Sequence, residues 1–87
     1  MTSTDGVEMF CKDDCERCAR LADFLTSEGI AFVKRSIDAE PDVQTEALML
    51  GIFSIPALKK GDNILRFKDI FDGSLMDKEK IMGFVQD

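Results

Sequence analysis

The chain has 87 residues, a formal net charge of −6 at pH 7, and 45% apolar and 32% charged residues. This length allows one compact domain and excludes a two-domain protein, while the apolar content excludes a disordered chain. The acidic balance is opposite in sign to a phosphate-binding surface, so we expect no nucleic-acid partner.

The sequence also predicts neither membrane insertion nor export. The longest apolar run, residues 47–53, is far shorter than the roughly 20 residues that span a bilayer, so we expect no membrane helix and no membrane partner. Asp5 and Glu8 stand where a signal peptide would be basic or apolar. We therefore expect a cytoplasmic, monomeric protein, with a flexible tail at residues 1–6 and a single domain over residues 1–87.

Sulfur is the chemically distinctive element of the composition. The chain contains no histidine, which removes the most common general base and the most common transition-metal ligand. Three cysteines, Cys11, Cys15 and Cys18, fall within eight residues. Without a secretion signal, such a cluster favours redox or metal chemistry over a structural disulfide framework.

The three cysteines lie at the junction between a predicted strand and a predicted helix. The apolar run at residues 7–11 predicts a strand. A helix is predicted from Cys15 onward, ended by Gly29, because apolar residues then recur at i, i+3, i+4 and i+7: Cys18, Leu21, Ala22 and Leu25. The Cys15-x-x-Cys18 pair is therefore expected at the start of this helix.

A second strand is predicted at residues 30–37 from its β-branched and aromatic residues. It is followed by a predicted helix at residues 42–50, with Pro41 in its first turn and Gly51 at its end. This strand, helix, strand, helix order requires a crossover connection between the two strands.

The last part of the chain predicts a hairpin and a closing helix. Strands at residues 55–60 and 63–67 flank Gly61 and Asp62, a two-residue connection typical of tight antiparallel hairpins. Ser74, three residues before Asp77, predicts the start of a helix that covers the sheet. The expected fold is α/β, in the order β-α-β-α-β-β-α, with a four-stranded mixed sheet flanked by three helices.

The predicted position of the cysteine pair suits thiol-disulfide exchange. The first N–H groups of a helix are unpaired and its dipole is positive there, so a thiolate at Cys15 is stabilised. The thiolate is the form that attacks a disulfide. Cys18, one turn further along, is placed to resolve the resulting mixed disulfide. Cys15 and Cys18 are thus the candidate catalytic residues.

A metal site is the alternative for the same sulfur atoms. Cys11, Cys15 and Cys18 form C-x3-C-x2-C, the spacing with which radical SAM enzymes hold an iron-sulfur cluster, but the chain is too short for their barrel. A cluster shared by two copies, or a zinc or copper site completed by Asp13 or an external thiol, remains open. Cys11 can also be a small buried hydrophobe at the end of its strand.

Two stretches of the chain resemble a known family. V-E-M-F-C-K-D-D-C-E-R-C-A-R-L-A-D-F-L at residues 7–25 and G-I-F-S-I-P-A-L at residues 51–58 resemble glutaredoxins and the glutaredoxin-like electron donors to ribonucleotide reductase. The resemblance implies a thioredoxin-like fold and a thiol-disulfide oxidoreductase that reduces protein or low-molecular-weight disulfides. It also implies that Pro56 is cis and faces the cysteine pair, and that the backbone of Ile55 pairs with substrate.

Further substrate-binding positions follow from the same resemblance. Lys12 matches the lysine that lies near the glutathione carboxylate in the family, and Arg17 stands where glutaredoxins usually have an aromatic residue. Gly73 and Ser74, with Asp72 and Asp77, loosely match the family's glycine-and-aspartate motif.

The resemblance also implies the partners. The client would be a protein with a disulfide, such as ribonucleotide reductase. No cofactor is expected beyond the redox-active Cys15-Cys18 pair. The reductant would be glutathione, another low-molecular-weight thiol or a dedicated reductase.

Overall fold

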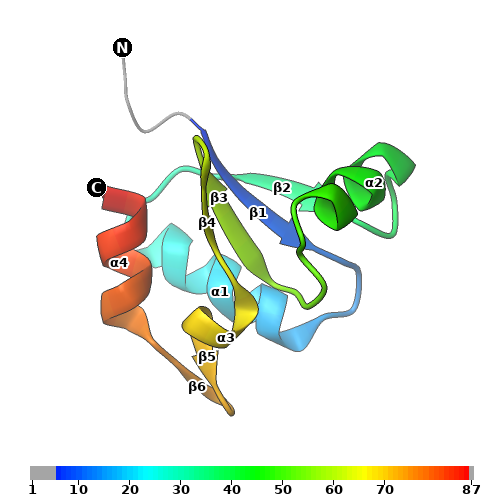
Figure 1. The fold of residues 1–87 in the computed structure, drawn as a ribbon. Helices are drawn as coiled ribbons and strands as arrows, with labels where there is room; N and C mark the ends of the chain where they lie inside the picture. The colour runs from blue at the N-terminus through cyan, green and yellow to red at the C-terminus, as the bar shows by residue number, and fades with distance from the viewer. Residues whose placement is uncertain (1–5, 87) are drawn as a thin grey trace.

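The computed structural model describes residues 6–86, so all of the expected tail except Gly6 lies outside the described residues (Figure 1). No helix within residues 6–86 is long and apolar enough to cross a membrane. The elements follow one another as β1 (Val7–Cys11), α1 (Glu16–Ser27), β2 (Val33–Ser36), α2 (Pro41–Met49), β3 (Ala57–Lys60), β4 (Asn63–Leu65), α3 (Phe67–Ile70), β5 (Phe71–Asp72), β6 (Leu75–Met76) and α4 (Lys78–Gln86).

The main sheet has four strands in the order β2-β1-β3-β4. β1 is parallel to β2 and antiparallel to β3, so that Met9 lies opposite both Lys34 and Leu58. β3 and β4 form the predicted hairpin, in which Lys60 pairs with Asn63 across the turn. The predicted four-stranded mixed sheet is therefore confirmed.

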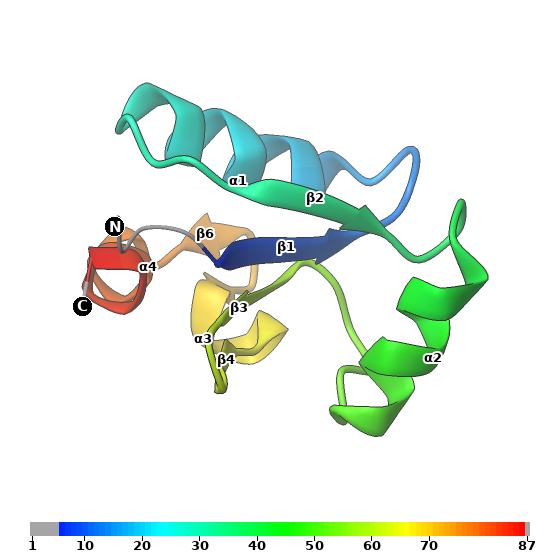
Figure 2. The same cartoon turned by 90° about the horizontal axis from the view of Figure 1, so that it is seen from above.

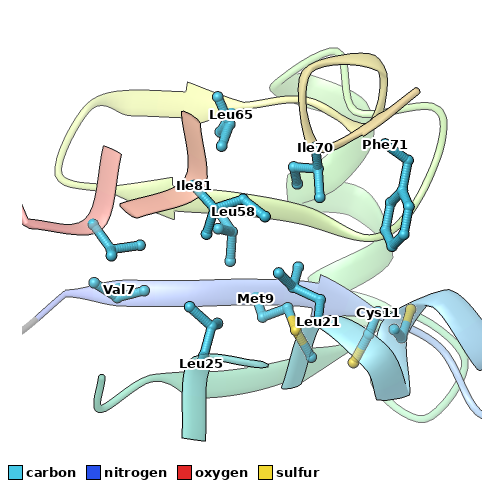
Figure 3. Close-up of a cluster of buried hydrophobic side chains, with 12 residues drawn as sticks. Val7, Met9, Cys11, Leu21, Leu25, Leu58, Leu65, Ile70, Phe71 and Ile81 are labelled. Carbon is cyan, nitrogen blue, oxygen red and sulfur yellow. The ribbon is translucent and has the colours of Figure 1, made fainter. Parts of the chain in front are cut away.

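Alternation along the strands gives the sheet two buried faces. Val7, Met9 and Cys11 point into one cluster, whereas Phe10 belongs to a second. α1 and α2 lie on opposite sides of β1 (Figure 2). The larger cluster (Figure 3) also contains residues of α1, the hairpin, the α3 region and α4: Cys18, Leu21, Leu25, Leu58, Leu65, Ile70, Phe71, Ile81 and Val85. The smaller one contains residues of α2 and the segment after it: Val43, Ala47, Ile52 and Ala57.

Glycine ends α1 as predicted, and the same turn shortens the second strand. Gly29 has a φ of +74°, and its N–H donates to the carbonyl of Thr26. The N–H of Ile30 donates to the carbonyl of Leu25, which completes a Schellman motif. Because this N–H is used by the helix end, the prediction of a strand from residue 30 is wrong, and β2 begins only at Val33.

The predicted strands around the hairpin are also too long. β3 begins at Ala57 and not at Ile55, since Pro56 has no N–H to donate to a strand ladder. β4 ends at Leu65, and Phe67 begins the short helix α3 instead of ending a strand. The expectation of three helices is therefore corrected to four, and a small β5–β6 hairpin is added.

The last helix begins at a different residue from the one predicted. Ser74 lies in the turn between β5 and β6, and Asp77 caps α4 by accepting a hydrogen bond from the N–H of Lys80 at 3.1 Å. We expect Asp77→Ala to lower the free energy of unfolding by about 1 kcal/mol, because a helix N–H loses its partner. Ser74→Ala is the matched control and should have no such effect. Guanidinium unfolding of both variants tests this, and equal losses would contradict the assignment of the cap.

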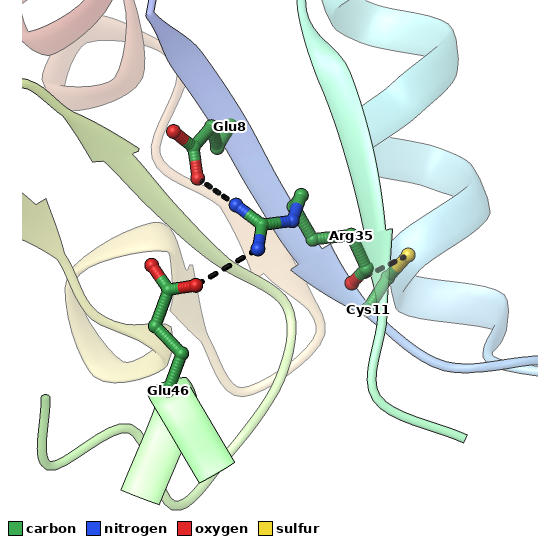
Figure 4. A network of polar contacts seen from close by, with 4 residues as sticks. All are labelled: Glu8, Cys11, Arg35 and Glu46. Carbon is green, nitrogen blue, oxygen red and sulfur yellow. Dashed lines mark hydrogen bonds and ion pairs between the residues drawn. The ribbon is translucent and has the colours of Figure 1, made fainter. Parts of the chain in front are cut away.

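An ion-pair network joins three elements on the α2 side of the sheet (Figure 4). Arg35 on β2 donates to Glu8 on β1 at 2.5 Å and to Glu46 on α2 at 2.8 Å. Its guanidinium also lies 5.7 Å from the ring centre of Phe10. These contacts tie α2 to the central strand β1 and the edge strand β2.

Candidate active site

Cys15 is the residue that caps the start of α1. Its backbone is extended, with φ −105° and ψ 110°, and its Sγ accepts a hydrogen bond from the N–H of Cys18 at 3.2 Å. The preceding residue, Asp14, has a φ of +58°, in the left-handed region that lets the chain turn sharply into the helix. A thiolate at Cys15 would therefore receive a hydrogen bond and the favourable field of the helix start.

Cys18 lies one turn further along and is only 4% exposed. Burial raises the pKa of its thiol to about 12, and a hydrogen bond with the sulfur of Cys15 acts in the same direction, against a backbone hydrogen bond near Lys12 that lowers it. Cys18 thus keeps its proton at neutral pH. The two cysteines differ in the way that thiol-disulfide exchange requires. Cys15 is accessible to a substrate, whereas Cys18 is buried behind it and protonated.

This difference predicts how the reduced protein reacts with iodoacetamide. At pH 7.5 we expect Cys15 to be alkylated at least about tenfold faster than Cys18, because alkylation needs an accessible thiolate. Raising the pH to 10 should leave Cys18 slow, since two pH units below a pKa of about 12 only about 1% of the thiol is ionised. Peptide mapping by mass spectrometry measures both rates. In guanidinium both should react alike, whereas equal rates in the folded protein would contradict the arrangement.

Cys11 is buried at the end of β1 and its thiol is engaged elsewhere. Its S–H donates to the carbonyl of Arg35 with a sulfur–oxygen distance of 3.8 Å (Figure 4). Burial raises the pKa of this thiol, and the charge of Lys34 opposes the shift. Cys11 is therefore a buried free thiol that packs in the core and forms no disulfide in this structure.

An open depression of about 600 Å³ surrounds the cysteines, and we call it the thiol depression. Its lining includes all three cysteines together with Lys12 and Lys34. Within residues 6–86, however, no three His, Cys, Asp or Glu side chains are grouped so that they could hold a metal ion. All three cysteines are free thiols, so the geometry supports thiol chemistry and lends no support to the C-x3-C-x2-C metal site.

The segment before β3 lies beside the same site. The Ile55–Pro56 peptide bond is cis and Pro56 is fully buried. Ile55 is half-buried and packs against the larger cluster, as Cys15 does. Ile55 and Lys12 line a second depression, of about 310 Å³, which we call the proline-loop depression. Lys12 lines both depressions, so the fold brings the predicted residues Lys12, Ile55 and Pro56 to one region.

The other predicted substrate-binding residues lie outside the two depressions around Cys15. Arg17 lies on the exposed side of the first turn of α1, with its guanidinium 5.7 Å from the ring centre of Phe67. Gly73 and Ser74 are exposed in the β5–β6 turn, where the carbonyl of Ser74 accepts a hydrogen bond from Arg20 at 3.0 Å. All three residues are described by the structure, and none of them lines the thiol depression or the proline-loop depression.

Phe67 lies in this region although the sequence places it only at the end of a predicted strand. In the structure it begins α3 and lies beside Arg17. A signal was available, because Arg17 occupies the position where the family usually has an aromatic residue. When the aromatic residue next to the cysteines is replaced, a distant segment can supply a ring at the same place. Sequence spacing alone does not identify that segment.

Comparison with known proteins agrees with the fold. No curated protein sequence matches the chain. Among solved structures, the crystal structure of a mutant of the thioredoxin-like protein BC3987 has a TM-score of 0.77 at 14% identity, covering 94% of this chain and 96% of that one. A glutaredoxin from Archaeoglobus fulgidus has a TM-score of 0.69 at 23% identity, covering 93% and 86%. A wheat glutaredoxin has a TM-score of 0.56 at 21% identity, covering 70% and 61%.

These structural similarities establish the thioredoxin-like fold, which confirms the expected fold class. The sequence comparison adds the family. A family model described as Glutaredoxin matches residues 7–64, which contain β1, the cysteine pair, the cis proline and most of the main sheet. The chain therefore belongs to the glutaredoxin family, whose general function is thiol redox chemistry.

Proposed function

We propose that this protein is a thiol-disulfide oxidoreductase that reduces disulfides of proteins or small molecules by dithiol exchange at Cys15 and Cys18. The observation that carries the proposal is the hydrogen bond from the N–H of Cys18 to the Sγ of Cys15, at the start of a helix. It gives an accessible sulfur a donor that stabilises negative charge, directly in front of a second, protonated thiol.

In the first step the thiolate of Cys15 attacks one sulfur of the client disulfide. A bond forms between Cys15 and that sulfur, the client S–S bond breaks, and the released client sulfur leaves as a thiolate that takes up a proton. The product is a mixed disulfide between the protein and its client.

In the second step the sulfur of Cys18 attacks the sulfur of Cys15. The Cys15-Cys18 disulfide forms, the mixed disulfide breaks, and the proton that Cys18 gives up passes to the departing client sulfur. The high pKa of Cys18, about 12, keeps this proton in place until the leaving sulfur can accept it. In sum, two electrons and one proton pass from the protein to the client, and the second proton on the reduced client comes from solvent.

Lys12, Ile55 and Pro56 would position the substrate beside Cys15. Lys12 and Ile55 line the depressions there, and the buried Pro56 follows Ile55 directly, which supports this role because a reacting disulfide has to be held in line with the attacking sulfur. The oxidised pair must then be reduced by an external thiol, such as glutathione, or by a dithiol reductase. The resemblance to electron donors of ribonucleotide reductase makes that enzyme a client to test, in the cytoplasm.

A redox titration tests the proposal. The protein is purified without oxygen and equilibrated in thiol buffers of defined potential, and the free thiols present at each potential are trapped with a mass label in guanidinium, where the buried cysteines also react. We expect Cys15 and Cys18 to convert together and reversibly between about −180 and −270 mV, the range of thioredoxin, glutaredoxins and protein disulfide isomerase.

Cys11 serves as the internal control in the same samples, because it should remain labelled as a thiol at every potential. Protection of all three cysteines until a chelator is added would overturn the redox assignment and identify a metal centre. Independent conversion of Cys15 and Cys18 would overturn the dithiol step.

A further inference from the structure

A pocket of about 180 Å³ opens between the loop after α2 and the start of α3, and the exchange reaction does not use it. We call it the aromatic pocket, because the rings of Phe53 and Phe67 contribute to its lining together with Ile52, Arg66 and Lys68. An apolar cavity of about 150 Å³ is large enough for benzene. The aromatic pocket thus matches the size of one aromatic or large aliphatic side chain.

The walls of the aromatic pocket are fixed by contacts across the fold. Arg66 donates to the carbonyls of Gly51 and Leu50 at 2.6 and 3.1 Å, which holds the loop that carries Phe53. On the opposite wall, Phe67 stacks on Phe71 with ring centres 5.7 Å apart. Such a preformed pocket costs little ordering when a side chain enters it.

Shared lining residues relate the aromatic pocket to the two depressions described above. Phe53 lines both the aromatic pocket and the proline-loop depression, and Lys12 lines both the proline-loop depression and the thiol depression. We call this series of three neighbouring hollows, from Cys15 to Lys68, the track. Phe53 is 81% exposed and Leu48, also on the track, is 57% exposed, which leaves apolar surface uncovered along it.

The charge at the far end of the track is opposite to that of the whole protein. The chain carries a net charge of −6, but both charged residues that line the aromatic pocket, Arg66 and Lys68, are cations. Lys68 is exposed, and the neighbouring Asp69 pairs instead with Lys80 at 3.8 Å. The complementary group on a ligand is a carboxylate.

We propose that the track binds a polypeptide client, with an aromatic or large aliphatic side chain in the aromatic pocket and an acidic side chain next to Lys68, while the client disulfide lies at Cys15. This inference rests on the proposed dithiol exchange and names its substrate class. A small disulfide reaches only the thiol depression and gains nothing from Phe53 or Lys68. A polypeptide gains apolar burial and a charge contact along the whole track.

Two matched disulfide peptides and a small disulfide test this. The two peptides are identical except for one dipeptide, a few residues away from the cysteine, which is Asp-Phe in one and Lys-Ser in the other. The small substrate is bis(2-hydroxyethyl) disulfide. We expect the unsubstituted protein to reduce the Asp-Phe peptide with a kcat/KM about tenfold higher than the Lys-Ser peptide. Phe53→Ser and Lys68→Glu should each reduce this ratio at least about threefold.

Matched control variants lie elsewhere on the surface. Leu75→Ser replaces another exposed apolar residue, 72% exposed on β6, and Lys78→Glu replaces an exposed lysine of α4. Both should keep the peptide ratio of the unsubstituted protein. Equal kcat/KM for the two peptides, or a ratio that survives both Phe53→Ser and Lys68→Glu, would overturn the inference.

A binding measurement tests peptide docking on the track separately from the proposed dithiol exchange. The Asp-Phe peptide with alanine in place of cysteine is titrated into ¹⁵N-labelled protein, and it should shift the amide signals of Phe53 and Phe67 but not that of Leu75. Absence of such shifts would contradict docking even if exchange occurs. Shifts without reduction of the small disulfide would instead overturn the proposed exchange and leave docking supported.

Discussion

Serine in place of Cys15 is expected to lower disulfide reductase activity by about a thousandfold or more, because the attacking sulfur is lost and a hydroxyl does not react with disulfides. The fold should survive, since Cys15 is partly exposed and a serine oxygen can accept the same helix-start hydrogen bond. Reduction of bis(2-hydroxyethyl) disulfide, coupled to a thiol reductant, measures the loss. Activity that persists in Cys15→Ser would overturn the proposed mechanism.

The two remaining cysteines serve as controls with distinct outcomes. Cys18→Ser should still attack but fail to resolve, so that a mixed disulfide between Cys15 and the client accumulates and is detected as an added mass. Cys11→Ala should keep most of the activity, because the Cys11 thiol is buried and bonded to the carbonyl of Arg35. Loss of exchange in a folded Cys11→Ala protein would show that Cys11 takes part in the chemistry.

The largest expected change in stability comes from Phe10. This ring is fully buried at the centre of the smaller cluster, between the sheet and α2, and it lies beneath the guanidinium of Arg35. Phe10→Ala should lower the free energy of unfolding by about 3 to 5 kcal/mol, from lost apolar burial and the cavity that remains. Small domains have only about 5 to 15 kcal/mol in total, so the variant should be marginally folded. Equilibrium unfolding in guanidinium measures the difference.

Phe53→Ala is the matched control for Phe10→Ala, because Phe53 is 81% exposed. Its effect on the free energy of unfolding should stay within about 0.5 kcal/mol. A small loss for Phe10→Ala, comparable with that of Phe53→Ala, would contradict the packing of α2 against the sheet.

Local sequence signals were sufficient for the elements that determine the chemistry. β1 was predicted with its observed bounds, and the helix that begins after Cys15 ends at the predicted glycine. Pro41 begins α2, as its fixed φ and missing N–H allow at a first turn. Each of these features depends on residues within one or two turns of the chain, so spacing and residue type were enough.

Other features needed contacts between distant segments. α3 has only four residues and no side-chain cap, so no local pattern marks it, and burial of Ile70 in the larger cluster holds it in place. The ion pairs of Arg35 likewise join residues of three elements. The late start of β2 has a local cause instead, because the N–H of Ile30 bonds back to the carbonyl of Leu25 at the end of α1.

The sequence by itself determined the family, the strand–turn–helix that presents Cys15 and Cys18, and the order of the main sheet strands and helices along the chain. Their physical causes are local: helix periodicity, glycine at helix ends, and the unpaired N–H groups of a first turn. Only the tertiary structure decided that Phe53, Phe67 and Lys68 meet in one pocket. Those residues come from segments that are brought together by packing of buried side chains and by the hydrogen bonds of Arg66 to the loop after α2, and such long-range contacts leave no periodic trace in the sequence.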